Sequence, residues 1–415
     1  MRKTIAVIGC FDTKLELVEY FSDAFERAGY GVLTIDTSLL PHDAPRKADY
    51  CTRDILEYCG RGYKEFIKAT KAECVGIMRD CIGEFMANLY RHGAFQAVIG
   101  GGGAQNSSIA MSAMQQLPFG LPKGIVSCVA AGANPFEGLV GRTDIVIFPT
   151  VADVVEMNPI LRVPIDNAIH AMLGMLENGN GQYVRDPKHS IVGVTCAGVT
   201  YKGTVMAANI LGQHGIDTVF FHGVTAGGYA MEDFLQRGEL DGALDLCIHD
   251  VLVEALGYYR FNHTEDKRLL RLAASGLPAV VSLSGMDVID IPLEAYRNFH
   301  EMPAWGKRNV FYHNATALHI KVIPEEMKKA AKLLVERLNA FVGPVTVVMP
   351  NNGFRANTMR GGELYDPEVD RILMDAVANG VKAKVKVVEI PCNANEPLFS
   401  QTVAREYLRQ IGIEE

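Results

Sequence analysis

The chain has 415 residues, of which 48% are hydrophobic and 21% charged, with 40 glycines and a formal net charge of −8 at pH 7. This length suggests two or three domains, and the composition is typical of an α/β protein rather than of a disordered or fibrous one. The acidic balance provides no global basic surface, so we expect no nucleic-acid partner.

The N-terminus is expected to begin a strand and not to be a targeting signal. Its apolar run ends at Ile8, which is too short for the core of a signal peptide. No run reaches the length of a membrane span. The nine cysteines are scattered without a Cys-x-x-Cys pair, which favours reduced thiols over a disulfide framework. The sequence therefore predicts a cytoplasmic protein.

The first half of the chain alternates apolar runs with segments of helical periodicity. The strands predicted in this half are 4–9, 32–36, 97–99, 124–128 and 143–148. The predicted helices are 12–28, 49–90 with a break at 60–62, one from the glycines to 116, and one that starts near Pro164. Strands that alternate with helices pair in parallel through right-handed crossovers, which predicts a doubly wound sheet.

A polar, glycine-rich stretch at 177–182 predicts a linker, so we expect domains at 1–183 and 184–415. The alternation of strands and helices restarts after it. The strands predicted there are 191–195, 217–222, 242–246, 279–283, 309–312, 345–349 and 384–390, with helices at 204–214, 227–234, 250–256 and 324–341. The fold predicted is α/β, with two Rossmann-like, doubly wound domains and mainly parallel sheets.

Four consecutive glycines, Gly100 to Gly103, follow an apolar run and precede a small-residue helix start. Backbone N–H groups are free at such a helix N-terminus and can bind an anion. Neither the dinucleotide spacing nor the Lys-Ser or Lys-Thr of a P-loop is present, so the motif does not name its ligand. We favour a phosphate or carboxylate site over the alternative, close packing of strand and helix. Its residues are Gly101, Gly102, Gly103, Ser107 and, at the next strand end, Ser127.

Asp12, Thr13 and Lys14 follow the first strand directly. Asp12 or Thr13 can cap the next helix, while Lys14 can reach a phosphate; capping alone also explains Asp12. Because parallel strands end at one edge of a sheet, we expect these residues to meet the glycine loop and the segment 127–135 at that edge.

The predicted strand 217–222 ends at His222, and a second glycine-rich turn follows it. His222 could be a general base, a ligand contact or a satisfied loop residue. Four further residues of this stretch are assigned to ligand binding. They are Thr225, Gly227, Gly228 and Glu232.

Two more loops are expected at strand ends, one with Asp287 and one with His313. Asp287 could bind a polar substrate and His313 exchange a proton, although loop capping explains both equally well. The catalytic group predicted here has His222 and His313 as proton donors or acceptors, with Asp287 orienting one of them. No ligand spacing demands a metal ion.

Several motifs occur in the order of one known family. They are 9–14, the glycine loop, 122–127, 222–232, 364–370 and 395–399. Over essentially its whole length the chain resembles the family of largely uncharacterised proteins that shares an ATP-binding region with the tomato tobamovirus-resistance protein. The resemblance implies two Rossmann-like domains, ATP as ligand, Mg²⁺ only as a companion of the nucleotide, and a homodimer.

Two classes of function stay open. The first is an enzyme that binds a nucleotide or small organic acid in a cleft between its domains and performs acid–base chemistry on it. The second is an ATP-dependent binding or regulatory module without catalysis. Titratable residues in several strand-end loops favour the enzyme, because a pure binder has less need of them.

Overall fold

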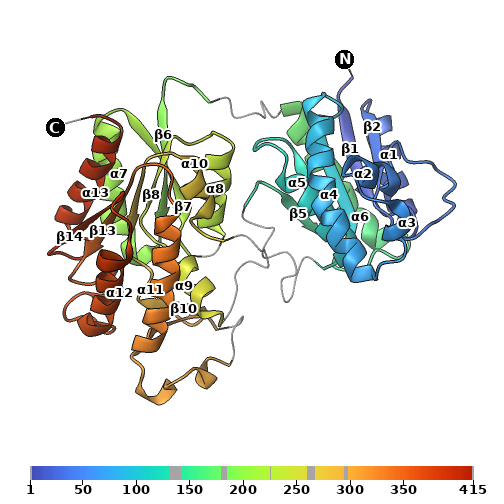
Figure 1. Cartoon of the computed structure of the whole chain (residues 1–415). Coiled ribbons are helices and arrows are strands. Elements are labelled where there is room, and N and C mark those ends of the chain that lie inside the picture. Colours follow the sequence, from blue (N-terminus) through green and yellow to red (C-terminus); the bar gives the residue numbers. More distant parts are fainter. Residues whose placement is uncertain are drawn as a thin grey trace. The chain divides into compact units, whose positions relative to one another are not determined.

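The computed structural model of the chain describes residues 2–129, 142–178, 185–224, 226–258, 267–293 and 298–413. The chain forms two compact units, Met1–Val184 and Arg185–Glu415 (Figure 1). Each unit has its own mainly parallel sheet with helices on both faces, so the predicted α/β fold of two Rossmann-like units is confirmed.

The N-terminal unit contains five parallel strands in the order β2-β1-β3-β4-β5. They are β1 (Thr4–Gly9), β2 (Gly31–Asp36), β3 (Ala97–Gly102), β4 (Lys123–Ser127) and β5 (Val146–Pro149). The core on one face includes α1 (Leu15–Arg27) and α6 (Pro159–Asn178); the other includes α2 (Thr52–Tyr58), α3 (Tyr63–Phe66), α4 (Lys71–Arg91) and α5 (Ala104–Gln115).

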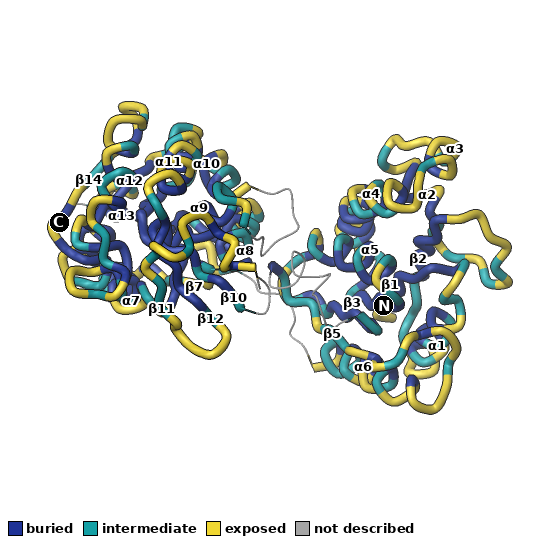
Figure 2. Tube along the Cα trace, turned by 90° about the horizontal axis from the view of Figure 1, so that it is seen from below, coloured by how far each residue is buried: buried dark blue, intermediate teal, exposed yellow. Residues whose placement is uncertain are grey.

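Strand β1 is apolar on both sides because it lies inside this sandwich. Ile5 and Val7 belong to the core with α1 and α6, whereas Ala6 and Ile8 point to the opposite core. Successive side chains of a strand alternate between faces, so a continuous apolar run is what a doubly covered strand requires. The tube in Figure 2 is accordingly dark blue along β1 and β3.

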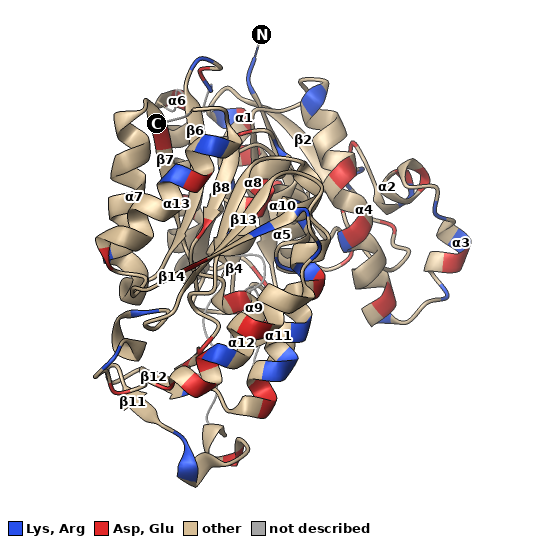
Figure 3. Cartoon of the chain, turned by 60° about the vertical axis from the view of Figure 1, so that its left-hand side comes forward, with Lys and Arg blue, Asp and Glu red and all other residues tan. Residues whose placement is uncertain are grey.

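The C-terminal unit has six parallel strands in the order β14-β13-β9-β8-β6-β7. They are β6 (Ser190–Cys196), β7 (Ile216–His222), β8 (Gly242–Asp245), β9 (Ala279–Ser282), β13 (Val345–Pro350) and β14 (Val385–Ile390). One face is covered by α7 (Tyr201–Gln213) and α13 (Pro397–Gln410). The other is covered by α8 (Gly227–Gln236), α9 (His249–Leu256), α10 (Leu270–Ser275), α11 (Pro324–Asn339) and α12 (Pro367–Gly380). Figure 3 shows both signs of charge on the outside of α11.

A small antiparallel sheet is inserted between β9 and α11. Its strands, in the order β10-β12-β11, are β10 (Val288–Pro292), β11 (Val310–Tyr312) and β12 (Ala317–Lys321). Of these only the segment 309–312 was expected to be a strand. The insertion leaves the parallel sheet intact because it lies beyond the carboxyl end of β9.

Both parallel sheets have the strand order of a flavodoxin-like fold, in which the first strand lies between the second and the third. The direction of winding therefore reverses between β1 and β3 in one unit and between β6 and β8 in the other. Ligands of doubly wound sheets bind at such reversals, outside the carboxyl ends of the strands. Within the described ranges, no helix has the length and apolar character needed to cross a membrane.

Candidate functional site

The first two glycines of the loop at the end of β3 are required for packing. A Cβ on Gly100 would lie 2.6 Å from the Cβ of Ala110 in α5, and one on Gly101 would lie 2.9 Å from Cδ2 of Leu17 in α1. Both distances are shorter than real Cβ contacts. Close approach of the two helices to β3 therefore explains these two glycines.

Gly102 and Gly103 have a different environment. Gly102 has φ +133°, which disfavours any L side chain, and no atom of the described residues lies within 4 Å of the ideal Cβ position of Gly103. Helix α5 begins directly afterwards, with Gly103 as its N-cap. None of the described residues accepts a hydrogen bond from the backbone N–H of Ala104, Gln105 or Asn106. This open helix N-terminus at the β1/β3 reversal has the donors that an anion needs.

A buried polar network holds the start of α5 in place. Thr37, which follows β2, donates from Oγ1 to Oδ1 of Asn106 at 2.7 Å, and Asn106 donates from Nδ2 to the carbonyl of Gly101 at 2.5 Å. Ser107 donates from Oγ to Oγ of Ser127 at 2.9 Å, and both serines are fully buried. These contacts give Ser107 and Ser127 a supporting role; their predicted contact with a ligand stays a prediction.

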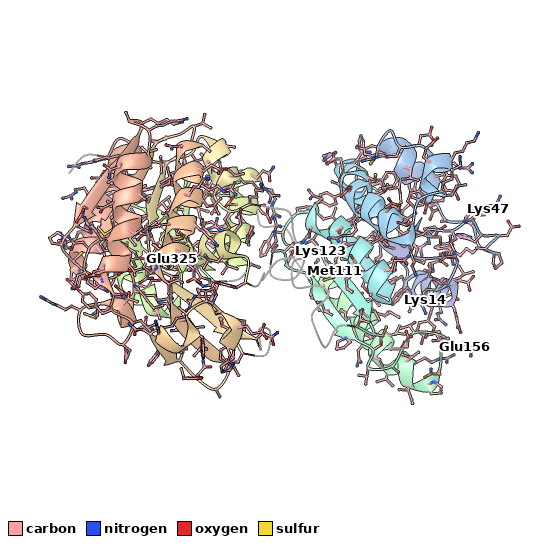
Figure 4. All side chains as sticks on the ribbon, turned by 60° about the horizontal axis from the view of Figure 1, so that its bottom comes forward. Lys14, Lys47, Met111, Lys123, Glu156 and Glu325 are labelled. Carbon is pink, nitrogen blue, oxygen red and sulfur yellow. The ribbon has the colours of Figure 1, made fainter. Side chains whose placement is uncertain are left out.

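The loop after β1 does not cap α1 in the expected way. Lys14 is the N-cap residue of α1, and no side chain caps the helix, so the capping assigned to Asp12 or Thr13 is wrong. Thr13 instead donates to Oδ1 of Asp12 at 3.0 Å. The ammonium of Lys14, labelled in Figure 4, donates to the carbonyl of Val154. The aliphatic part of Lys14 lies beside Gly102, with Cγ 3.6 Å from the ideal Cβ position.

Asp36, a residue that sequence reasoning did not select, fixes this loop. Its Oδ1 accepts from the backbone N–H of Phe11 at 3.1 Å and of Ser38 at 2.9 Å. Its Oδ2 lies 2.8 Å from Nε2 of His42. The signal that could have identified it in the sequence is an aspartate at the last position of a predicted strand.

His222 lies at the end of β7 as predicted, and it is exposed. Its Nδ1 lies 2.6 Å from the carbonyl oxygen of Val224 and 3.3 Å from the backbone nitrogen of the same residue, so the backbone of Val224 engages Nδ1. No described residue bonds to Nε2. Nε2 is therefore the ring nitrogen that is available to a ligand.

The glycines after His222 permit close packing at the start of α8. A Cβ on Gly227 would lie 2.3 Å from the carbonyl oxygen of His222, and one on Gly228 would lie 2.5 Å from Nε of Arg268. Glu232 is buried and accepts from the guanidinium of Arg268 and, at 2.7 Å, from the backbone N–H of Leu269. Burial raises the pKa of Glu232. Thr225 lies outside the described residues.

Asp287 is buried beside a lysine. Lys321 Nζ is 3.3 Å from Oδ2 of Asp287 and 2.6 Å from Oδ1 of Asp370. Within the described part of the chain, no hydrogen bond joins Asp287 to His222 or His313. The contact expected of Asp287 is therefore not formed, because Lys321 holds its carboxylate.

A second carboxylate, Asp290 in β10, is the centre of a histidine cluster. Arg355 binds it through two nitrogens, at 2.8 and 3.1 Å, and Nε2 of His319 lies 3.3 Å from Oδ1. The backbone N–H of Asp290 donates to Nε2 of His249 at 3.0 Å. His313 is exposed, and its ring stacks on that of His319 with centroids 4.6 Å apart.

Burial determines the titration of this cluster. It lowers the pKa of His249 to about 4, where Arg355 and His222 act in the same direction and Asp290 and Asp287 oppose it. Burial likewise lowers the pKa of His319 to about 4. Burial alone would raise the pKa of Asp290, but Arg355 lowers it to about 2. Two neutral imidazoles therefore surround an ionised carboxylate.

Sequence reasoning selected His222 and His313 but missed His249, His319 and Asp290. The segments 288–292 and 317–321 alternate apolar and polar residues, which is the pattern of a half-buried strand and could have identified two of them. Among the described residues, no three His, Cys, Asp or Glu side chains are grouped so as to hold a metal ion.

Comparison with known proteins assigns both units to one family. Models of the N-terminal and C-terminal domains of the uncharacterised protein family UPF0261 match residues 3–181 and 189–411. A UPF0261 protein of Mesorhizobium japonicum is 30% identical over 97% of this chain and 98% of its own length. One of Clostridium tetani is 28% identical over 99% of this chain and 100% of its own.

The comparison also found a plant protein and solved structures of low similarity. The ToMV resistance protein Tm-1 of Solanum lycopersicum is 27% identical over 97% of this chain, which corresponds to 55% of the tomato protein. A crystal structure of UDP-N-acetylglucosamine 2-epimerase is 8% identical over 100% of this chain and 98% of that one, with a TM-score of 0.25, too low to carry an argument. The two domain matches, in order and over nearly the whole length, show that the chain belongs to the uncharacterised protein family UPF0261.

Proposed function

We propose that this protein is an enzyme that binds a nucleotide or a small organic acid through its anionic group at the N-terminus of α5. The observation that carries the proposal is the open space at Gly103, next to backbone N–H groups of α5 that donate to no described residue. The glycines at 102 and 103 keep Cβ atoms away from these donors. Such a site suits a phosphate or a carboxylate equally.

Acid–base chemistry is the reaction class that the C-terminal unit supports. His222 and His313 are both exposed, and Nε2 of His222 bonds to no described residue, so both imidazoles are available for proton exchange at the C-terminal unit. Histidine suits this role because its unperturbed pKa, about 6.5, lies near neutrality. In this proposal His222 and His313 are the catalytic residues.

ATP is one candidate ligand. The N–H groups of the first turn of α5 fit a phosphate, and a nucleotide would bring Mg²⁺ with it. The ammonium of Lys14 donates to the carbonyl of Val154 and has two further N–H groups that could donate to a phosphate. The similarity to a tomato resistance protein also supports a second candidate function, a binding module without catalysis.

The substitution Gly103→Ala tests the anion site. Gly103 has φ −81° and ψ −172°, which alanine adopts freely, so the methyl group should enter open space and cover the N–H groups without straining the backbone. We expect affinity for ATP or the organic acid to fall about 10- to 100-fold, the loss of one charge-assisted hydrogen bond. The measurement is isothermal titration calorimetry.

Gly174→Ala is the matched control, because Gly174 lies in α6 of the same unit and also has no described atom within 4 Å of its ideal Cβ. It should bind like the parent protein. Equal affinity of Gly103→Ala and the parent for ATP, inorganic phosphate and a dicarboxylate would refute the anion site.

Thermal stabilisation separates the two functional classes. A ligand that binds only the folded state at 100 times its Kd adds about 2.7 kcal/mol to the unfolding free energy. Stabilisation by small acids, with turnover lost in His222→Asn and His313→Asn, supports the enzyme. Stabilisation by ATP alone, without any turnover, supports the binding module.

A further inference from the structure

We infer that Asp290, and not Asp287, is the carboxylate that fixes histidine chemistry in the C-terminal unit, and that it acts on His313 through the stacked ring of His319. His319 and Asp290 are then positioning residues. This inference rests on the proposed role of His313 in proton exchange. It implies that, of the two stacked rings, His313 takes up a proton while His319 stays neutral.

The contacts of His319 determine its tautomer. Its Nδ1 lies 3.3 Å from Nη2 of Arg355 and 3.1 Å from Nδ2 of Asn357. The amide of Asn357 is oriented by its Oδ1, which accepts from Nε of Arg355 at 3.2 Å. Both neighbours of Nδ1 are therefore donors, and Nδ1 must carry the lone pair.

The hydrogen of His319 is consequently on Nε2, the nitrogen that lies 3.3 Å from Oδ1 of Asp290. Nδ1 accepts hydrogen bonds, and Nε2 faces the negative charge of the Asp290 carboxylate. A second proton could bind only at Nδ1, where the Arg355 guanidinium and the Asn357 amide stand. The geometry thus keeps His319 neutral.

The neutral ring of His319 supports His313. The two planes are inclined by 15°, with centroids 4.6 Å apart. The backbone N–H of His313 donates to the carbonyl of Ala317 at 3.0 Å, which closes the hairpin between β11 and β12. The hairpin holds the backbone of His313 close to β12, the strand that contains His319. His313 can therefore gain a proton without meeting a positive charge on its neighbour.

The charged and titratable groups around the two stacked rings come from three other parts of the unit. Asp290 is in β10, Arg355 follows β13, and His249 begins α9. The opposite charges of Asp290 and Arg355 offset each other, because two nitrogens of the guanidinium donate to the two carboxylate oxygens. His249 accepts the backbone N–H of Asp290 at Nε2, which fixes it too as a neutral ring.

Asp287 cannot replace Asp290 as the carboxylate beside His319. It lies one residue before β10, and its Oδ2 faces the ammonium of Lys321 at 3.3 Å. Asp290 and His319, in contrast, stand directly opposite each other in the register of β10 and β12.

NMR of the full chain with labelled histidines tests the inference without a substrate. We expect the His319 ring to show the Nε2–H tautomer at neutral pH and to remain neutral while His313 takes up its proton. A His319 ring with the Nδ1–H tautomer, or one that protonates before His313, would overturn the inference.

The variant His319→Phe gives a second readout, because it keeps a flat ring under His313 and removes both nitrogens. If His319 is neutral, the midpoint of the His313 titration should move by much less than about one pH unit. A rise of about one unit or more would mean that the two rings compete for the proton, against the inference.

His300 supplies the internal control. It is exposed in the same unit, and its ring lies beside that of Phe299 at an angle of 33°, so its titration should be the same in both proteins. A shifted His300 would reveal a general rearrangement, and the tautomer of His319 in the parent protein would then decide the question. Failure to find a ligand would refute the proposed function while leaving these NMR results unaffected.

Discussion

Lys321 and two carboxylates form a buried group whose charge depends on pH. Burial, and next the charge of Asp287, raises the pKa of Asp370 to about 7 from its ordinary 3.8, although Lys321 opposes the rise. The folded state thus keeps a proton that the unfolded chain releases near pH 3.8. The contribution of this proton to the unfolding free energy is complete below pH 3.8 and is lost as pH rises to about 7.

Replacing Asp370 by Asn should remove this dependence. The unfolding free energy of Asp370→Asn, relative to the parent, should increase as pH rises from about 4 to 7, by at most about 1.4 kcal/mol for each pH unit. Urea unfolding at several pH values measures the difference. Asp375→Asn, at an exposed position of the same helix, should show no such trend, and a flat difference for Asp370→Asn would contradict the assignment.

At the level of residues, the sequence identifies positions but not their partners. His222 and His313 could be selected because they follow predicted strands, and Asp287 because it lies in a strand-end loop. Whether Asp287 meets a histidine or a lysine depends on β12, whose Lys321 comes from 34 residues further along the chain. Local pattern contains no information about such a contact.

Helix α7 shows how an element can depend on one missing side chain. A Cβ on Gly203 would lie 1.9 Å from the carbonyl oxygen of Ala394, which is backbone and has no rotamer to change. Gly203→Ala should therefore destabilise the C-terminal unit by about 1 to 3 kcal/mol or more. Chemical denaturation followed by circular dichroism measures the loss.

Gly212→Ala is the control in the same helix, because none of the atoms in the described part of the chain lies within 4 Å of its ideal Cβ. Alanine is the better helix former, so this variant should be neutral or more stable by up to about 1 kcal/mol. Similar stabilities of the two variants would show that α7 does not pack against the segment at Ala394 as described.

At the level of elements, the parallel strands were predictable, whereas β11 was the one strand of the described antiparallel sheet that the sequence predicted. Strand β13, for example, is apolar apart from Thr346 and lies between turn residues, the pattern of a strand covered on both faces. Strands β10 and β12 are five residues each and carry charged or polar side chains that tertiary contacts satisfy. Their alternation was visible, but Asp290, His319 and Lys321 weakened the apolar signal.

At the level of the whole molecule, each unit has a complete sheet and separate hydrophobic clusters on its two faces. Chains that contain only residues 1–184 or only residues 185–415 should therefore each fold, with unfolding free energies of about 5 to 15 kcal/mol. Circular dichroism during urea titration would show one cooperative transition for each. A chain without a cooperative transition would show that its unit depends on the rest of the protein.

The pairing of β10 with β12 also restricts how the length of this chain can change. Asp290 and His319 meet because they lie directly opposite each other on the two strands. Successive side chains of a strand point to opposite faces of the sheet, so the face of each side chain depends on its position in the strand. One residue inserted within β12 would turn His319 to the opposite face and bring Leu318 or Ile320 in front of Asp290. Insertions and deletions inside these ten residues should therefore be far rarer among functional relatives than substitutions at their exposed positions.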